Sequence, residues 1–224
     1  VGLRDQAPPV HLHDPPRLAQ HDLDVPRVFV AFGRVLDGKR RGVDIGKSDE
    51  YFDDAANEAI LQKVANKCYR PMNSLLEELV AKHDGRFKCS FSITGTALDQ
   101  MERFAPDVIE SYQRLAASGC VEFLGETYHH SLAGVTHPRE FAEQVALHSA
   151  RIEELFGQRP QVFRNTELMF HDELASRIAG LGFRGVLAEG AERVLGWRSP
   201  NFVYASRPAP ALRADLPWRR VALV

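Results

Sequence analysis

The feature that most constrains this fold is an alternation of helix-type and strand-type segments through the middle of the chain. Apolar residues recur at helical spacing over residues 55–83, where Pro71 marks a break or kink. Residues 86–94 (RFKCSFSIT) then alternate apolar and polar side chains, which is typical of a strand. The alternation continues to residue 189, so one pattern governs most of the chain.

Two helices are expected after that strand, one capped by Thr96 and one opened by Pro106 and running through Ala117. The remaining expected elements are a strand at 120–125, a helix at 138–157, a strand at 161–168, a helix at 171–180 and a strand at 183–189. Strands that alternate with helices usually pair in parallel through right-handed crossovers. The sequence therefore predicts an α/β fold, either a barrel or a doubly wound sheet.

Phosphate-binding motifs distinguish these two folds. No GxGxxG or GxxxxGK[ST] motif occurs at any expected strand-to-helix turn, so a nucleotide-binding sheet loses its main signal. We therefore favour a barrel, in which functional residues follow the C-terminal ends of the strands.

Composition excludes several classes of protein. The formal net charge of -2 argues against a general nucleic-acid or membrane-surface binder. There is neither an apolar run of about eighteen residues nor the apolar core of a signal peptide. Three well-separated cysteines without CxxC spacing indicate reduced thiols, and hence a cytoplasmic protein. The sequence leaves the oligomeric state open.

The two ends of the chain are less regular than its middle. Residues 19–42 carry a basic run at 39–41 and are expected to be a solvated surface insertion. Residues 205–224 are rich in Pro, Ala and Arg without clear periodicity. Because a complete barrel needs further strands, we expect residues 1–204 to form a barrel domain that is incomplete at its C-terminal side, followed by an unmatched tail.

Carboxylates gather at two neighbouring strand ends. Glu167 follows one strand in FRNTELMF, and Glu122 and Glu126 follow the preceding one, in VEFLGETYHHSL, beside Tyr128 and His130. A carboxylate at a barrel mouth can act as a nucleophile or a general base. Aromatic rings nearby can stack on sugars. The alternative for each residue is a solvated loop position or a hydrogen-bond partner, so the cluster carries more weight than any member.

A metal site is the rival interpretation. His11 and His13 form an HxH pair whose alternate side chains would point the same way, as in metal-dependent hydrolase barrels. The adjacent pair His129-His130 faces different ways, and no HxxEH or HExxH motif completes the set. We expect no bound metal, and a polysaccharide deacetylase-like barrel stays as an alternative. No GxSxG motif indicates serine-based acyl transfer.

Several long stretches follow one another at sensible spacing: DIGKSDEYFDD, the run from GRFKCSF to HHSLAGV, FGQRPQVFRNTELMFHDELA and GVLAEGAERVLGWRSPNFVY. Together they resemble the α-amylase-like branch of glycoside hydrolase family 57, over about residues 43–204 and a short island at the front. The resemblance implies a (β/α)7 barrel that cleaves or transfers α-glucosidic bonds by a retaining mechanism. The implied substrate is an α-glucan or maltooligosaccharide, and no cofactor is needed.

The resemblance also implies roles for the first two motifs of the family. VHLHDPPRL looks like the sugar-binding His-Gln-Pro motif, in which His13 and Pro15 match and Asp14 replaces Gln. The second motif, Gly-x-x-Glu, matches Gly119 and Glu122. Both motifs are thus expected to contribute to the substrate site.

The third motif centres on the nucleophile, and Glu167 occupies that place, although Arg164 and Asn165 differ from the Trp-containing version. The fourth motif, with the acid/base Asp, has no counterpart here, because the context of Asp215 does not match. Little turnover is therefore expected, and a non-catalytic carbohydrate-binding remnant is the second alternative. The expected substrate-binding residues are His13, Glu122, Glu126, Tyr128, His130 and Arg164.

Overall fold

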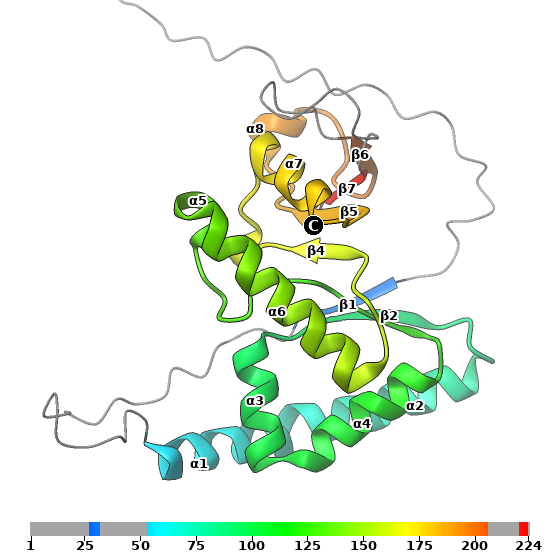
Figure 1. The fold of residues 1–224 in the computed structure, drawn as a ribbon. Helices are drawn as coiled ribbons and strands as arrows, with labels where there is room; N and C mark the ends of the chain where they lie inside the picture. The colour runs from blue at the N-terminus through cyan, green and yellow to red at the C-terminus, as the bar shows by residue number, and fades with distance from the viewer. Residues whose placement is uncertain (1–26, 32–52, 206–219, 224) are drawn as a thin grey trace, which may run out of the picture.

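The computed structural model describes residues 27–31, 53–205 and 220–223, in which helices pack against two short sheets (Figure 1). The strands are β1 (Arg27–Ala31), β2 (Lys88–Ser92), β3 (Val121–Phe123), β4 (Val162–Arg164), β5 (Gly185–Ala188), β6 (Val203–Ala205) and β7 (Arg220–Leu223). The helices are α1 (Asp54–Val64), α2 (Arg70–Lys82), α3 (Gly95–Phe104), α4 (Pro106–Ala117), α5 (Ala133–Thr136), α6 (Pro138–Phe156), α7 (Asp172–Gly180) and α8 (Glu192–Leu195). A π-helical turn, η2 (Ala65–Tyr69), and a 3-10 turn, η3 (Thr166–Leu168), complete the set. The expected order of helices and strands between 55 and 189 is confirmed.

The two sheets join into one arc. The first has the order β1-β2-β3 and is parallel, and the second has the order β4-β5-β7-β6, with only β6 antiparallel to its neighbour. A parallel bridge between Gly125 and Phe163 connects them. Around it, the amide of Gly125 donates to Val162 O and the amide of Arg164 donates to Gly125 O, each at 2.8 Å. The bridge lies just beyond β3, so the C-terminal end of β4 is aligned with the loop that follows β3.

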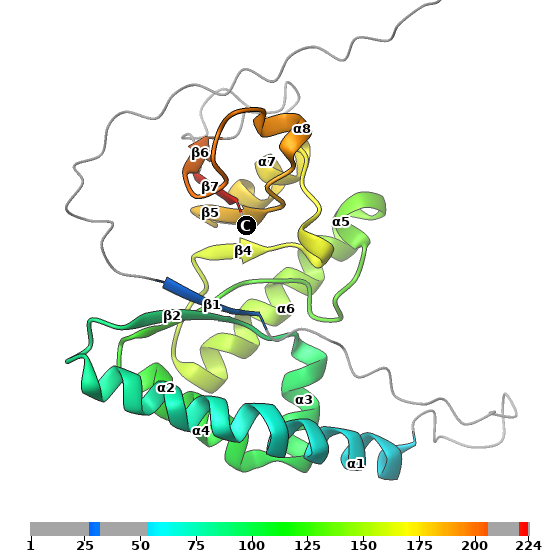
Figure 2. The same ribbon diagram turned by 180° about the vertical axis from the view of Figure 1, so that it is seen from behind.

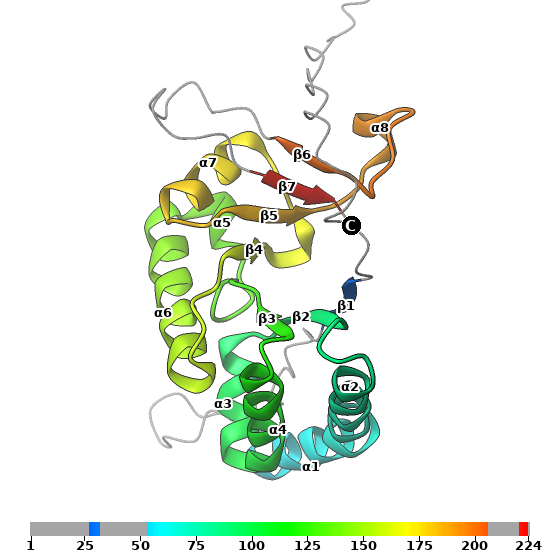
Figure 3. The same ribbon diagram turned by 90° about the vertical axis from the view of Figure 1, so that its right-hand side faces the viewer.

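The arc is open within the described residues, since no strand pairing there connects β1 to β6 and closes a barrel (Figures 2 and 3). In the side view of Figure 3, α3, α4 and α6 lie on the outer side of the strands. The parallel α/β architecture is therefore confirmed at the level of strands and crossovers. No helix in the described part of the chain is long and apolar enough to cross a membrane.

The sequence did not predict β1, β6 or β7, and two of these lie inside segments expected to stay outside the sheet. Residues 27–31, inside the expected surface insertion 19–42, form β1 and pair in parallel with β2. β7 lies inside the expected tail 205–224 and enters the sheet between β5 and β6. Each of these two segments therefore contributes a strand that its local pattern did not indicate, because non-local pairing gives short segments a partner.

Two local expectations about helix geometry are refined. Pro71 does not break the helix, because the π-helical turn η2 absorbs the irregularity ahead of it and the proline takes one of the first two positions of α2. The cap of α3 is Thr94, whose hydroxyl accepts from the amide of Ala97 at 3.1 Å. The prediction that Thr96 is the cap is wrong by two residues, since the helix begins at Gly95.

The first core lies between the β1–β3 sheet and its helices. Phe91 of β2 meets the ring of Tyr112 edge-on at 4.9 Å and lies 5.7 Å from the ring of Phe123. Phe123 in turn stacks on Phe156 at 4.1 Å. These aromatic side chains are at most 8% exposed, so this sheet rests on an interlocked set of rings.

The second core is smaller and lies beside β4 and β5. Phe163 of β4 contacts Phe141 at 5.6 Å and Phe183 at 5.2 Å, measured between ring centroids. Helix α6 belongs to both cores, since Phe141 and Val145 near its start pack in the second and Ile152 packs in the first. This one helix therefore fastens the two sheets together.

Candidate functional site

Glu167 lies directly beyond the C-terminal end of β4, in the short turn η3. Its backbone is left-handed, with φ 53° and ψ 22°, so it is not in a regular helix. The next residue, Leu168, also has a positive φ of 56°, and its carbonyl accepts from the amide of Glu189 beyond β5 at 3.4 Å. The turn thus rests against a neighbouring strand end, and the Glu167 side chain is 75% exposed.

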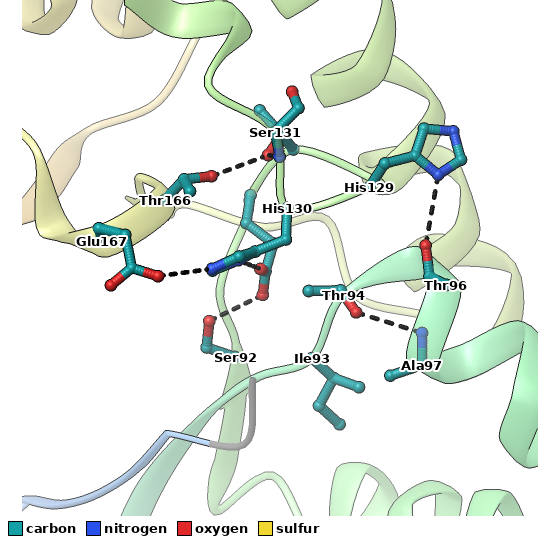
Figure 4. A network of polar contacts seen from close by, with 12 residues as sticks. Ser92, Ile93, Thr94, Thr96, Ala97, His129, His130, Ser131, Thr166 and Glu167 are labelled. Atoms are coloured by element: carbon teal, nitrogen blue, oxygen red, sulfur yellow. Dashed lines mark hydrogen bonds and ion pairs between the residues drawn. The ribbon is translucent and has the colours of Figure 1, made fainter. Parts of the chain in front are cut away.

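His130 faces Glu167 from the loop that follows β3 (Figure 4). Its Nε2 lies 3.2 Å from Glu167 Oε1, and its Nδ1 lies 3.8 Å from Glu126 Oε2. Glu126 is only 1% exposed, and its other oxygen accepts from the hydroxyl of Ser92 at 2.7 Å. The 3.8 Å contact is an ion pair rather than a hydrogen bond. A buried and an exposed carboxylate therefore flank one imidazole.

The electrostatics of this cluster favour a protonated imidazole. Glu126 is the main cause of a raised pKa at His130, and Glu167 adds to the rise. Burial and the positive charge of Arg164 oppose it. The imidazolium form is stabilised because it lies between two groups that are negatively charged when ionised.

A second histidine, His148, forms hydrogen bonds with the backbone next to this cluster. His148 of α6 is fully buried, and its Nδ1 accepts from the amide of Glu126 at 3.4 Å. Its Nε2 donates to the carbonyl of Ile93 at 2.8 Å. Burial lowers the pKa of His148, which favours the neutral ring that these two contacts require. His148 thereby ties the chain beyond β3 to the end of β2.

Two threonines hold the loop of His130 against η3. The hydroxyls of Thr127 and Thr166 lie 3.2 Å apart, and Thr127 Oγ1 also accepts from the amide of Ser131 at 3.0 Å. Both threonines are buried. The 3.2 Å contact between His130 and Glu167 is therefore set by the backbone of two loops as well as by the side chains themselves.

The other expected substrate-binding residues are distributed differently. Tyr128 is 8% exposed and donates its hydroxyl to Asp99 at 2.6 Å, while its ring covers the Cα of Gly95. Glu122 is the central residue of β3 rather than its end, and it accepts from Ser90 at 3.5 Å. The structure thus brings Glu126, His130 and Glu167 together but encloses Tyr128.

Arg164 is the last residue of β4 and is half-buried. Its Nη1 is buried without a hydrogen-bond partner in the described part of the chain. Together with its effect on the pKa of His130, this places a positive charge near the carboxylates. His11, His13, Pro15 and Asp215 lie outside the described residues.

The sequence did not single out Ser92 or His148, although both left a signal. Ser90 and Ser92 alternate with the apolar residues of β2, as expected of side chains on the opposite face of the sheet. His148 and Gln144 are four residues apart on the buried face of α6, so both polar side chains point inward. A polar pair on the apolar face of a helix was therefore the clue.

The site offers an exposed carboxylate held by an imidazole beside a guanidinium, an arrangement suited to nucleophilic or acid–base chemistry. Within residues 27–31, 53–205 and 220–223, no group of three or more His, Cys, Asp or Glu side chains is arranged to hold a metal ion.

Residues 39–213 match the family described as Glycosyl hydrolase family 57. The chain belongs to this family. The family 57 chain is also 42% identical over 159 residues to the protein named "Putative alpha-amylase" from Methanocaldococcus jannaschii. That match covers 70% of this chain and 34% of the relative, so the chain spans about a third of the relative's length.

Solved structures share the fold. The 4-alpha-glucanotransferase from Thermococcus litoralis superposes with a TM-score of 0.61 at 16% identity, over 75% of this chain and 25% of that one. The GH57-type branching enzyme from Pyrococcus horikoshii gives a TM-score of 0.59 at 12% identity, over 87% and 45%. At such low identity these likenesses show the fold of the family 57 chain and nothing finer.

Proposed function

We propose that this family 57 domain carries the nucleophile of a hydrolase or transferase that acts on α-glucans by a retaining mechanism. The observation that carries the proposal is the exposed carboxylate of Glu167, held at 3.2 Å by His130 beyond the end of β4. The names of the relatives, alpha-amylase, 4-alpha-glucanotransferase and branching enzyme, support α-glucans such as maltooligosaccharides as the substrate class.

In this mechanism, the carboxylate of Glu167 attacks the anomeric carbon while the bond to the leaving oxygen breaks. An acid protonates that oxygen, and a glycosyl-enzyme ester forms. Water then cleaves the ester in hydrolysis, or a sugar hydroxyl does so in transfer. A retaining site needs a second carboxylate about 5–5.5 Å from the nucleophile. Because Glu126 is 1% exposed, we do not assign it as that acid.

We further propose that the arc of strands is part of a seven-stranded (β/α) barrel whose mouth forms the substrate cleft. Arg164 and His130 would meet the sugar beside Glu167, and His13 and Glu122 would contribute as the family motifs imply. Glu126 and Tyr128 would act from beneath the surface. The free thiols of Cys68, Cys89 and Cys120 favour a reducing compartment such as the cytoplasm.

The proposal is tested with an aryl α-glucoside whose leaving group needs little protonation. We expect the chain to cleave this substrate, and Glu167→Ala to lower the rate by roughly 10⁴-fold. Azide should restore turnover of Glu167→Ala by occupying the space of the lost carboxylate, and it should yield a glucosyl azide of inverted configuration.

The matched control is Glu110→Gln, since Glu110 is exposed on α4 and remote from the strand ends. Full activity of Glu167→Ala would reject Glu167 as the nucleophile. Unactivated maltooligosaccharides should react slowly, because general acid catalysis contributes typically 10²–10⁴-fold. Binding of maltooligosaccharides without any turnover would favour the non-catalytic alternative instead.

A further inference from the structure

The contacts around Glu126 form a continuous path from the sheet to the surface. The path runs from the Ser92 hydroxyl at the end of β2, through the Glu126 carboxylate and the His130 ring, to Glu167 beyond β4. Figure 4 shows Ser92 and Glu167 on either side of His130. Three strand ends therefore meet through one chain of polar groups.

Exposure rises steeply along this path. The side chain of Glu126 is 1% exposed, that of His130 is 14% exposed and that of Glu167 is 75% exposed. Glu167 is thus open to solvent, whereas Glu126 is buried next to His130. A buried carboxylate is costly unless a positive group compensates it, and Oε2 of Glu126 has no hydrogen bond of its own among the described residues. Its compensating partner is the His130 ring at 3.8 Å.

The backbone on both sides of the His130–Glu167 contact is unfavourable. His130 has φ 52° and Glu167 has φ 53°, a left-handed conformation that residues other than glycine rarely adopt. Such geometry persists where the surroundings enforce it, often at functional sites. Here the Thr127–Thr166 contact joins the two loops, and the resulting conformation turns the imidazole and the carboxylate toward each other.

We propose that Glu126 is a positioning residue, which holds His130 as an imidazolium so that His130 orients the carboxylate of Glu167 for attack. The inference rests on the proposed function, in which Glu167 is the nucleophile. It also separates Glu126 from the substrate-binding residues among which the sequence placed it.

The charges that face His130 agree with this role. They are Glu126 from the loop after β3, together with Glu167 and Arg164 from the end of β4. The two carboxylates raise the pKa of His130, and Arg164 opposes them. When Glu167 becomes a neutral ester, Glu126 remains as the counter-ion of the imidazolium. The buried carboxylate thus keeps His130 charged throughout the reaction cycle.

The test compares the unmodified chain with the variant Glu126→Gln, an isosteric change that removes the buried charge. NMR titration of the imidazole signals, with the His130 signal identified by its loss in His130→Gln, should show a lower pKa of His130 in Glu126→Gln than in the unmodified chain, because the largest cause of its raised pKa is removed. The exposed Glu167→Gln should lower it less, because solvent screens that charge. The exposed control Glu110→Gln should leave it unchanged.

Kinetics on the activated aryl glucoside provide the second readout. The rate should fall as pH rises through the pKa of His130, and Glu126→Gln should move this basic limb to lower pH. The kcat should drop while KM stays constant, because Glu126 does not reach the substrate. Direct binding of substrate by Glu126 would raise KM instead, and that result would overturn the assignment.

The two proposals can fail separately. An unchanged pKa of His130 in Glu126→Gln would overturn the positioning role even in an active enzyme, whereas a fully active Glu167→Ala would overturn the nucleophile alone. If Glu126→Gln does not fold, Glu126→Asp retains the charge but withdraws it by one methylene. A smaller fall in the pKa of His130 would then support the role, and no fall would overturn it.

Discussion

The two halves of the arc bury their apolar side chains to different extents. In the half with β1–β3, rings from β2, β3, α4 and α6 interlock, and Phe91, Tyr112 and Phe123 are at most 1% exposed. In the half with β4–β7, the core is smaller, and Trp197 and Phe202 are 87% and 60% exposed. The first half is thus held by its own core. The second half depends on α6 and on the seam between the halves, which is the backbone bridge of Gly125 with Phe163.

The largest expected effect comes from opening the first core. Phe91→Ala should lower the free energy of unfolding by about 3–5 kcal/mol, because the surrounding rings cannot collapse into the cavity. Phe163→Ala is the same change in the second half, where Phe163 is also fully buried. We expect it to cost less, since fewer groups enclose the cavity. Denaturant unfolding measures both, and a larger loss for Phe163→Ala would reverse the comparison.

The seam itself is tested at Gly125. A Cβ added there would overlap the ring of Phe183, so Gly125→Ala must displace that ring or the backbone bridge to Phe163. Overpacking of this kind typically costs about 1–3 kcal/mol. Gly180→Ala is the control, because a Cβ at Gly180 meets nothing within 4 Å. Equal stability of the two variants in thermal unfolding would show that the seam tolerates expansion.

The pH dependence of stability should report His148 of α6, which joins the chain beyond β3 to the end of β2. Its pKa is lowered in the folded chain, so the folded state resists protonation and the unfolded state does not. Its stabilising contribution is complete above the unfolded pKa of about 6.5 and is lost as pH falls toward the folded pKa. His148→Gln should cost about 1–3 kcal/mol at neutral pH and make the acid-side decline shallower. The exposed His83→Gln should leave that decline unchanged, and an identical slope in His148→Gln would reject this role.

The smallest expected effect is at the N-terminus of α3. Thr94→Ala removes the hydroxyl that caps Ala97 and should cost about 1 kcal/mol. Thr96→Ala should cost less, because the contacts of the Thr96 hydroxyl within the described residues are longer, at 3.3 and 3.5 Å. Chemical denaturation of both variants measures their free energies of unfolding. A larger loss of stability for Thr96→Ala would show that Thr96 is the cap.

The order of elements from 55 to 189 could be predicted because helical and strand periodicities are local properties of the sequence. The strands β1 and β7 could not, since each is a short segment that acquires its role by pairing with a distant strand. The strand β6 and its antiparallel pairing with β7 were not predicted for the same reason. Local pattern therefore predicted the middle of the chain, and non-local pairing decided the ends.

The meeting of His130 with Glu167 could be predicted in outline, because neighbouring parallel strands end at the same edge of a sheet. The burial of Glu126 and Tyr128 could not. It depends on His148 of α6 and Asp99 of α3, which approach from elements far along the chain. Sequence pattern thus indicated that residues at these strand ends lie close together, but it did not indicate how deeply each is buried.

Helix α6 has a consequence for how the molecule opens. The first turns of α6 pack in one core and its last turns in the other. Neither half can therefore detach without exposing the buried side chains at one end of this helix. Partial unfolding that frees only one sheet is therefore disfavoured, and the amide hydrogens at the centre of α6 should exchange with solvent only when the whole described fold opens. A single helix in this way makes two unequal cores behave as one cooperative unit.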